Sequence, residues 1–218
     1  MRPHVILNAG VTADGKIATR TGDSAISSKE DLERVHRIRE SVDAIMVGIG
    51  TVLLDDPRLS IHKIDSHAEN PIRVVADSRA RIPLSARMFN EKGTTIIAVS
   101  AKADKERVRK IEKRAEVYVC GAEKVDLKCL MRKLYRRGVQ TLLLEGGGNL
   151  NYSMLRSGLV DEVRFAIAPR LVGGRDAVSL VEGEGFPTVA EGVELELLKH
   201  YSLGRDLILE YRVVRKGD

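Results

Sequence analysis

The feature that most constrains the fold is the alternation of short aliphatic runs with helical patterns. Runs rich in aliphatic and β-branched residues recur at 4–8, 44–48, 72–76, 95–100, 117–120, 141–145 and 162–168. Amphipathic helical patterns lie between several of them. Strands that alternate with helices are typical of a largely parallel sheet covered by helices, so the sequence predicts an α/β fold.

Two of the helical patterns carry recognisable start and stop signals. A helix over 29–40 is predicted because Ser28 and Asp31 resemble a capping box, with Asp in place of the usual Glu, and an apolar stripe follows. Asp126 can cap a second helix, which Gly138 ends. Both helices are expected to turn an apolar face toward the core.

The end of the chain departs from the alternation. Strand-like runs at 193–202 and 206–214 are joined by residues 203–205, which predicts an antiparallel hairpin and therefore a mixed sheet. No internal repeat, low-complexity stretch or long linker divides the sequence. We therefore expect a single domain over 1–218.

Composition narrows the partners. The chain is 43% hydrophobic and 31% charged, which suits a buried core and not a disordered chain. A net charge of +5 fits nucleic acid, an anionic surface or a phosphate-bearing ligand. Over 102–114, however, basic and acidic residues are interspersed as on a solvated helix face, and the absence of Trp disfavours base stacking. We expect no nucleic-acid partner.

The sequence has few features of disulfide-rich, zinc-binding or membrane proteins. Cys120 and Cys129 are too few for a disulfide framework or a zinc site made of cysteines alone. His67 and Glu69 have the spacing of a zinc deaminase motif, but its second half, P-C-x-x-C, does not follow, so no metal is expected. No apolar run approaches the roughly 18 residues of a membrane span. The prediction is a cytoplasmic protein without a membrane partner.

Glycines follow two of the predicted strands. After 44–48 the chain continues Gly48-Ile-Gly50-Thr51, which suits either a nucleotide-binding loop or a tight strand-to-helix turn. It is not a full dinucleotide fingerprint, because Leu53 stands where a third glycine is expected.

A second glycine segment follows 141–144. Glu145 is followed by three glycines and then by a helical pattern over 151–157. Glycines are entropically costly, so either a pyrophosphate seated at the helix start or a structural turn is expected there. Glu145 stands at the carboxyl end of a strand, where α/β proteins bind ligands.

Two further strand ends carry polar groups. Asp14 and Gly15 form a turn dipeptide, which predicts either a hairpin turn or a lid over a site. Asp77, Ser78 and Arg79 follow the strand 72–76, and their hydroxyl and guanidinium groups suit a ribose or its 2′-phosphate.

An ordered set of segments carries a resemblance to a known family. The segments are 14–18, 35–39, 48–59, 75–78, 145–150 and 168–174, and together they span nearly the whole chain. In this order they resemble the reductase of riboflavin biosynthesis. The resemblance extends to the reductase half of the bacterial deaminase-reductase and, more closely, to the free-standing archaeal reductase.

The resemblance implies a dihydrofolate-reductase-like, mixed and mainly parallel sheet flanked by helices, a homodimer, and NADPH as hydride donor. It implies reduction of the ribosyl group of a phosphorylated ribosylaminopyrimidine. Together with the strand-end groups, the cofactor-binding residues expected are Ala9, Thr51, Asp55, Asp77, Ser78, Arg79, Gly146, Gly147, Gly148, Asn149 and Leu150. The substrate-binding residues expected are Asp23, Arg39, Leu59, His62 and Glu145.

Several points stay open at this stage. Glu145, Asp55 and Lys16 are candidates for proton transfer, in no fixed order. Arg39 is expected to bind the substrate phosphate, with an ion pair to Glu40 or Asp43 as the alternative. Bacterial relatives carry an arginine in place of His62. The imidazole of His62 suits phosphate only when it is protonated. Bacterial relatives also often carry Trp near the position of Ala25, which offers no such stacking contact here.

The substrate also has an alternative. Because the sequence has no deaminase half and archaeal and fungal pathways reduce before they deaminate, 2,5-diamino-6-ribosylamino-4(3H)-pyrimidinone 5′-phosphate is expected, and its deaminated uracil counterpart is the alternative. Competing functions are another NADPH reductase acting on a pterin and a non-catalytic nucleotide- or nucleic-acid-binding protein. Assays with dihydrofolate and retention on nucleic acid separate these from the expected reductase.

Overall fold

The computed structural model describes residues 1–215. Its contacts cluster into two compact units, one of Met1–His4 with His36–Leu143 and one of Val5–Val35 with Leu144–Asp218. The single domain expected over 1–218 stays a prediction.

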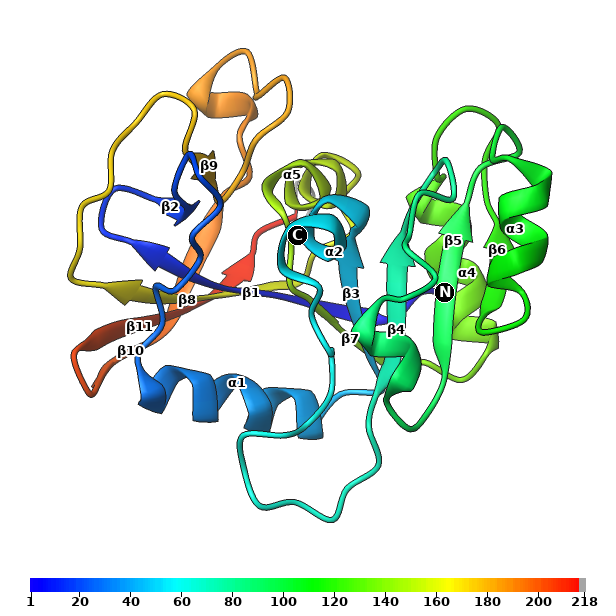
Figure 1. Cartoon of the computed structure of the whole chain (residues 1–218). Coiled ribbons are helices and arrows are strands. Elements are labelled where there is room, and N and C mark those ends of the chain that lie inside the picture. The colour runs from blue at the N-terminus through cyan, green and yellow to red at the C-terminus, as the bar shows by residue number, and fades with distance from the viewer. Residues whose placement is uncertain (216–218) are drawn as a thin grey trace. The chain divides into compact units, whose positions relative to one another are not determined.

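The first unit is built on parallel strands. Its elements are β3 (Ala44–Gly48), α2 (Ile49–Asp55), β4 (Ile72–Ala76), η1 (Arg87–Asn90), β5 (Thr95–Val99), α3 (Lys105–Ile111), β6 (Glu116–Val119), α4 (Leu127–Arg136) and β7 (Thr141–Leu144), whose last residue belongs to the other unit. The strand order is β7-β3-β4-β5-β6, and β3 through β6 pair in parallel. Figure 1 shows α3 and α4 beside β5 and β6.

The core of this unit is continuous aliphatic sequence. Ile45, Val74 and Ile97, on three neighbouring strands, are fully buried. Strands covered on both faces have no polar alternation, which is why these runs are aliphatic throughout. The predicted cap of α4 is confirmed, because the side chain of Asp126 accepts a hydrogen bond from the backbone N–H of Cys129.

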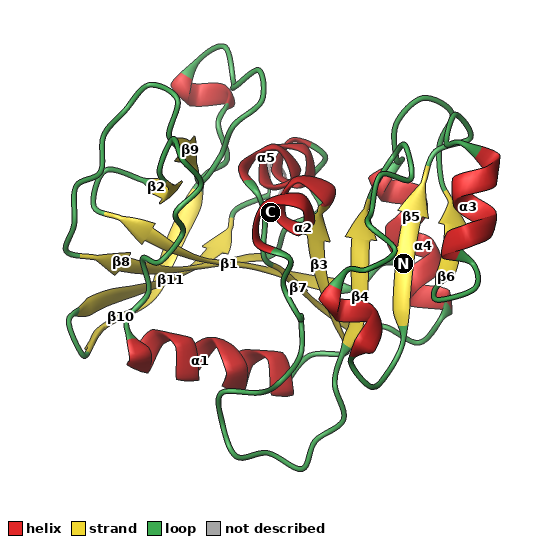
Figure 2. Ribbon diagram, in the orientation of Figure 1, coloured by secondary structure: helices red, strands yellow, loops and turns green. Residues whose placement is uncertain are grey.

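The second unit combines parallel and antiparallel pairing. Its elements are β1 (His4–Thr12, whose first residue belongs to the first unit), β2 (Lys16–Ala18), α5 (Gly148–Arg156), β8 (Glu162–Ala168), β9 (Val178–Ser179), η2 (Val189–Glu191), β10 (Leu195–Leu203) and β11 (Asp206–Val213). The order is β10-β11-β8-β1, with β1 parallel to β8 and the other pairs antiparallel. Figure 2 shows that the chain between β8 and β10 is mostly loop.

Most predicted elements are confirmed. Helix α1 (Lys29–Glu40) has the predicted bounds, and the backbone N–H of Asp31 donates to Ser28 Oγ at 3.1 Å as the capping signal requires. The predicted antiparallel hairpin is β10 with β11, joined at Gly204 in a left-handed conformation (φ 57°). Among the described residues, no helix is long and apolar enough to cross a membrane.

The prediction of a hairpin at Asp14 and Gly15 is wrong. Gly15 turns the chain at φ 78°, but β1 pairs with β8 and β2 pairs with β9. In that pairing Lys16 stands opposite Ser179, far along the sequence. A turn dipeptide fixes a local reversal and not the strand that the next residues join.

Candidate active site

The turn from β3 into α2 holds two of the predicted cofactor residues. Gly48 is the N-cap with an extended backbone, and no side chain caps the helix. Thr51 is half-buried in α2 and Asp55, its last residue, is exposed. A Cβ built on Gly50 meets no atom within 4 Å. The packing of the protein therefore does not require glycine at position 50, and the open space beside Gly50 can admit a ligand.

The residues after β4 form a tight turn. Asp77 is fully buried, and one carboxylate oxygen accepts a hydrogen bond from the N–H of Ile82 at 2.8 Å. The other oxygen has no hydrogen-bond partner, and burial raises the pKa of this carboxyl. Ser78 Oγ accepts from the N–H of Val125, while the Arg79 side chain is 53% exposed. Asp77 thus shapes the turn that presents Ser78 and Arg79, and its own contact with a cofactor stays a prediction.

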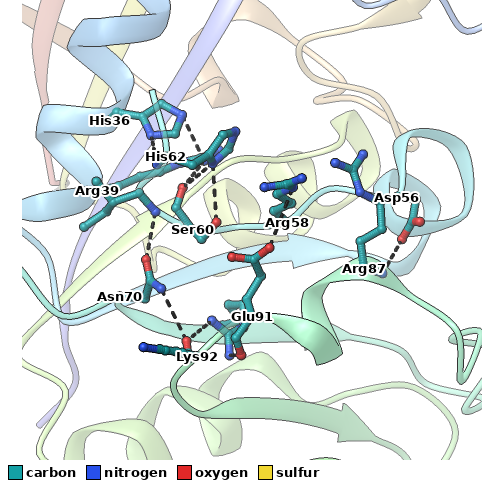
Figure 3. A network of polar contacts seen from close by, with 12 residues as sticks. His36, Arg39, Asp56, Arg58, Ser60, His62, Asn70, Arg87, Glu91 and Lys92 are labelled. Atoms are coloured by element: carbon teal, nitrogen blue, oxygen red, sulfur yellow. Dashed lines mark hydrogen bonds and ion pairs between the residues drawn. The ribbon is translucent and has the colours of Figure 1, made fainter. Parts of the chain in front are cut away.

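A network around α1 holds the segment that carries His62 (Figure 3). His36 is buried, and its Nδ1 accepts from the backbone N–H of His62 at 3.1 Å. Arg39 donates from Nη1 to the carbonyl of Ser60 at 3.0 Å. Asn70 accepts from the N–H of Ile61 at 2.9 Å. His36 therefore holds this segment by its contact with the backbone of His62.

Both histidines of this network favour the neutral form. Burial, and then the positive charge of Arg39, lower the pKa of His36 to about 3. Burial also lowers the pKa of His62, as do Arg39 and Arg58, although the Ser60 carbonyl opposes them. Since a carbonyl only accepts, the contact of 3.0 Å from His62 Nδ1 to Ser60 O places the neutral ring's proton on Nδ1.

Leu59 lies at the start of the same segment. Its backbone is left-handed at φ 52°, and its side chain is 1% exposed. A role of Leu59 in substrate binding stays a prediction.

In the second unit, the glycine segment leads into α5. Gly146 has φ 85°, a conformation that favours glycine, and the Gly146–Gly147 peptide bond is cis. A Cβ on Gly148 would lie 2.4 Å from the carbonyl oxygen of Ser179. Glycine at position 148 therefore allows the backbone of Ser179, and not a ligand, to approach closely. Glu145, directly before the glycines, is half-buried.

The start of α5 also suits an anion. Its N-cap is Gly147, and no side chain caps the helix, so the first-turn N–H groups lack a side-chain acceptor. Asn149 donates to Glu182, and Asn151 donates to the Leu180 carbonyl at 2.8 Å. Asn151 Oδ1 is buried without a hydrogen-bond partner. Leu150 is half-buried. These residues fix α5 against the loop that follows β9.

The turn after β1 is bound to the loop that precedes β9 and to β9 itself. Asp14 accepts hydrogen bonds from the Thr12 hydroxyl and from the N–H groups of Gly173 and Val172, and these bonds, that from Thr12 first, lower its pKa to about 2. Lys16 Nζ donates to Ser179 Oγ at 2.9 Å. The structure thus brings Lys16 and Gly148 together around Ser179.

The remaining predicted residues lie apart from this contact. Ala9 is half-buried in β1, and Asp23 is exposed, with its carboxylate accepting from the N–H of Ala25. The sequence indicated no role for Ser179, which Lys16 contacts, or for Lys102, which forms an ion pair with Glu123. Ser179 lies in a two-residue strand that has no periodicity, and Lys102 lies in a stretch interpreted as a solvated helix face.

Parallel strands that end in glycine-rich or polar turns, completed by an antiparallel hairpin, define an α/β protein of the dihydrofolate-reductase-like class. Residues 3–209 match the sequence profile of the RibD C-terminal domain, and the chain belongs to this family. It superimposes with a TM-score of 0.83 and 26% identity on the diaminohydroxyphosphoribosylaminopyrimidine deaminase/5-amino-6-(5-phosphoribosylamino)uracil reductase of Thermotoga maritima, over 98% of this chain and 57% of that one.

Two relatives define the similarity in sequence. The 2,5-diamino-6-ribosylamino-4(3H)-pyrimidinone 5′-phosphate reductase of Methanothermobacter thermautotrophicus is 57% identical over 98% of this chain and 99% of its own. The riboflavin biosynthesis protein RibD of Actinobacillus pleuropneumoniae is 40% identical over 98% of this chain and 57% of its own. The resemblance to riboflavin-biosynthesis reductases is confirmed.

Proposed function

We propose that the chain reduces the ribosyl group of 2,5-diamino-6-ribosylamino-4(3H)-pyrimidinone 5′-phosphate to the ribityl form, with NADPH as hydride donor, in riboflavin biosynthesis. The observation that carries the proposal is the 57% identity, over nearly the full length of both chains, to the archaeal reductase of that name. A reductase of this family requires a nicotinamide cofactor, and the choice of NADPH is part of the proposal.

The donor groups of the described residues fit such a cofactor. The first-turn N–H groups of α5 suit a pyrophosphate, and the Arg79 guanidinium suits a phosphate monoester. The open space beside Gly50 lets a ligand approach the backbone. The residues proposed to hold the cofactor are Ala9, Thr51, Asp55, Asp77, Ser78, Arg79 and Gly146 to Leu150.

The chemistry sets what the protein must supply. The ring C1′–O4′ bond breaks, O4′ takes up a proton, and loss of the amine N–H proton leaves an open-chain imine. When bound, a nicotinamide would supply the hydride that C1′ requires, and the substrate nitrogen would take up a proton. The protein must therefore align two carbons, move protons at O4′ and the nitrogen, and exclude water.

Proton transfer is assigned to groups at strand and helix ends. We propose Glu145, Asp55 and Lys16 for this work, with Glu145 next to the glycine segment as the residue on the substrate side. Lys16 is oriented by its hydrogen bond to Ser179 Oγ. A positioned acid or base near the reacting atoms contributes about 10²- to 10⁴-fold to such a rate.

The substrate is held by the residues around α1 and by Asp23. We propose that Arg39 binds the 5′-phosphate, because a guanidinium forms bidentate hydrogen bonds to phosphate oxygens. His62 and Leu59 lie on the segment that Arg39 fixes at Ser60. The protein is further proposed to be a cytoplasmic homodimer.

The proposal is tested with the purified protein and NADPH. Loss of NADPH absorbance is measured with the phosphorylated diaminopyrimidinone, its deaminated uracil counterpart and dihydrofolate, and the product is identified by mass spectrometry. We expect turnover that is fastest with the diaminopyrimidinone and yields a product heavier by two hydrogens. The proposal is contradicted if only dihydrofolate is turned over, or if none of the three substrates is. Light scattering gives the oligomeric state.

A further inference from the structure

Three loops meet at the carboxyl ends of the parallel strands β4, β5 and β6. They carry Arg79, Lys102 and Glu123, which follow these strands in that order. Lys102 Nζ lies 3.2 Å from one carboxylate oxygen of Glu123, and Arg79 Nη2 lies 3.7 Å from the other. Arg79 also donates to the carbonyl of Lys102 at 3.4 Å. One carboxylate therefore pairs with two cations at the strand ends.

The backbone that carries these charges is held in place. Ser100 donates from its N–H and its Oγ to the carbonyl of Ser78. The N–H of Lys102 donates to the carbonyl of Ala122 at 3.2 Å, and the N–H of Val125 donates to Ser78 Oγ at 3.0 Å. These hydrogen bonds join the loops after β4, β5 and β6 around Ser78. They hold the backbones of Arg79 and Lys102 in place, while the two charged side chains remain exposed.

The charge of this group favours an added anion. Arg79 and Lys102 contribute two positive charges and Glu123 one negative charge, and their side chains are 53%, 60% and 64% exposed. A phosphate monoester carries close to two negative charges at neutral pH and accepts several hydrogen bonds. It can replace Glu123 between the two cations, and Ser78 beside them offers a hydroxyl of the kind that suits a ribose.

We infer that Lys102 and Arg79 together bind the 2′-phosphate of the cofactor's adenosine, and that Glu123 occupies the cations in its place until the cofactor binds. The inference rests on the proposed function, and it adds Lys102 and Glu123 as the residues that set the preference between the phosphorylated and unphosphorylated cofactors. Lys102 binds the phosphate directly, whereas Glu123 acts by competing with it.

Binding of adenosine 2′,5′-bisphosphate and adenosine 5′-monophosphate, which differ only in the 2′-phosphate, tests the inference by calorimetry. In Lys102→Gln, the Kd of the bisphosphate should rise about two- to fivefold, since exposed charge pairs make modest contributions. In Glu123→Gln it should fall about two- to fivefold, because the competing charge is removed. The Kd of the monophosphate should stay within about twofold in both variants.

Lys113→Gln is the matched control. It removes the same charge from an exposed lysine that precedes β6, whereas Lys102 and Glu123 lie at the carboxyl ends of their strands. If Lys113→Gln weakened binding of the bisphosphate as much as Lys102→Gln does, the effect would come from net charge alone and the inference would be overturned. Weaker binding in Glu123→Gln would show that Glu123 supports the phosphate site and would overturn its competing role.

Turnover separates this inference from the proposed function. The ratio of kcat/KM for NADPH over NADH should fall in Lys102→Gln and rise in Glu123→Gln. If the wild type binds both adenosine phosphates equally but still reduces the pyrimidine substrate, the inference fails and the proposed function stands. If it prefers the bisphosphate but oxidises neither cofactor, the proposed function fails and the 2′-phosphate site stands.

Discussion

Replacement of Arg39 by alanine gives the most direct test of the substrate side. Arg39 is half-buried, and its Nη1 donates to the carbonyl of Ser60 at 3.0 Å. Loss of that bond should cost about 1 kcal/mol of positioning whatever the substrate, or roughly fivefold in kcat/KM. Loss of a charge-assisted hydrogen bond to phosphate should cost about 1.5 to 3 kcal/mol more, a further tenfold to more than a hundredfold.

The two costs separate when the substrate phosphate is removed. The assay measures kcat/KM for the phosphorylated substrate and for the dephosphorylated nucleoside with wild type, Arg39→Ala and Arg37→Ala. Arg37 is an exposed arginine of the same helix, α1, and its replacement should leave both values within about twofold. Arg39→Ala should reduce turnover of the nucleoside about fivefold and that of the phosphorylated substrate at least about fiftyfold.

Equal losses on the two substrates would refute the reasoning. In that case Arg39 positions the protein's own groups, Ser60 among them, and the 5′-phosphate is bound elsewhere. Arg39→Lys adds a second criterion, because it keeps the charge but loses the planar fork. It should fall between wild type and Arg39→Ala on the phosphorylated substrate.

Three further predictions follow from the environments of single residues. Because the pKa of His62 is lowered and phosphate favours the protonated ring, KM for the phosphorylated substrate should fall only as pH drops below the ordinary histidine value of about 6.5. His62→Arg should remove that component, and an unchanged KM–pH profile in this variant would exclude His62 from phosphate binding. Arg73 is buried and donates to three loop carbonyls, so Arg73→Met should lower the free energy of unfolding in urea by about 3 kcal/mol, and an unchanged midpoint and slope would contradict this. A Cβ on Gly148 would lie 2.4 Å from Ser179 O, so Gly148→Ala should destabilise the protein by about 1 to 3 kcal/mol. Gly50→Ala should not destabilise the protein, but it should weaken NADPH binding. If Gly50→Ala were the less stable variant, both assignments would be refuted.

Local signals predicted most of the fold. The caps at Ser28 and Asp126 place two helices, because each cap satisfies backbone N–H groups through a side chain only three residues away. The aliphatic strands are equally visible, since strands buried on both faces admit almost no polar residue. In contrast, the partner of Lys16 could not be predicted, because β2 and β9 are too short for a periodic pattern and are joined only through long-range pairing.

The candidate site shows the same limit. Glycine content marked the start of α5, but only the structure distinguishes Gly148, which packs against Ser179, from Gly50, which faces open space. Likewise, nothing in the sequence joins Lys102 to Glu123, since their contact depends on the register of two neighbouring strands. Spacing identifies residues that can bind a ligand, and tertiary packing decides which of them the protein has already used.

The chemistry of the first unit gathers at one edge for a physical reason. Strands β3 to β6 are parallel, so their carboxyl ends share an edge of the sheet. The middle residues of β3, β4 and β5 are buried and mostly aliphatic, so the polar groups that can meet a ligand stand largely after the strands. Ser78, Lys102 and Glu123 stand within four residues of the ends of β4, β5 and β6. The order of the strands therefore fixes which charges become neighbours, and Arg79, Lys102 and Glu123 meet because β4, β5 and β6 are adjacent.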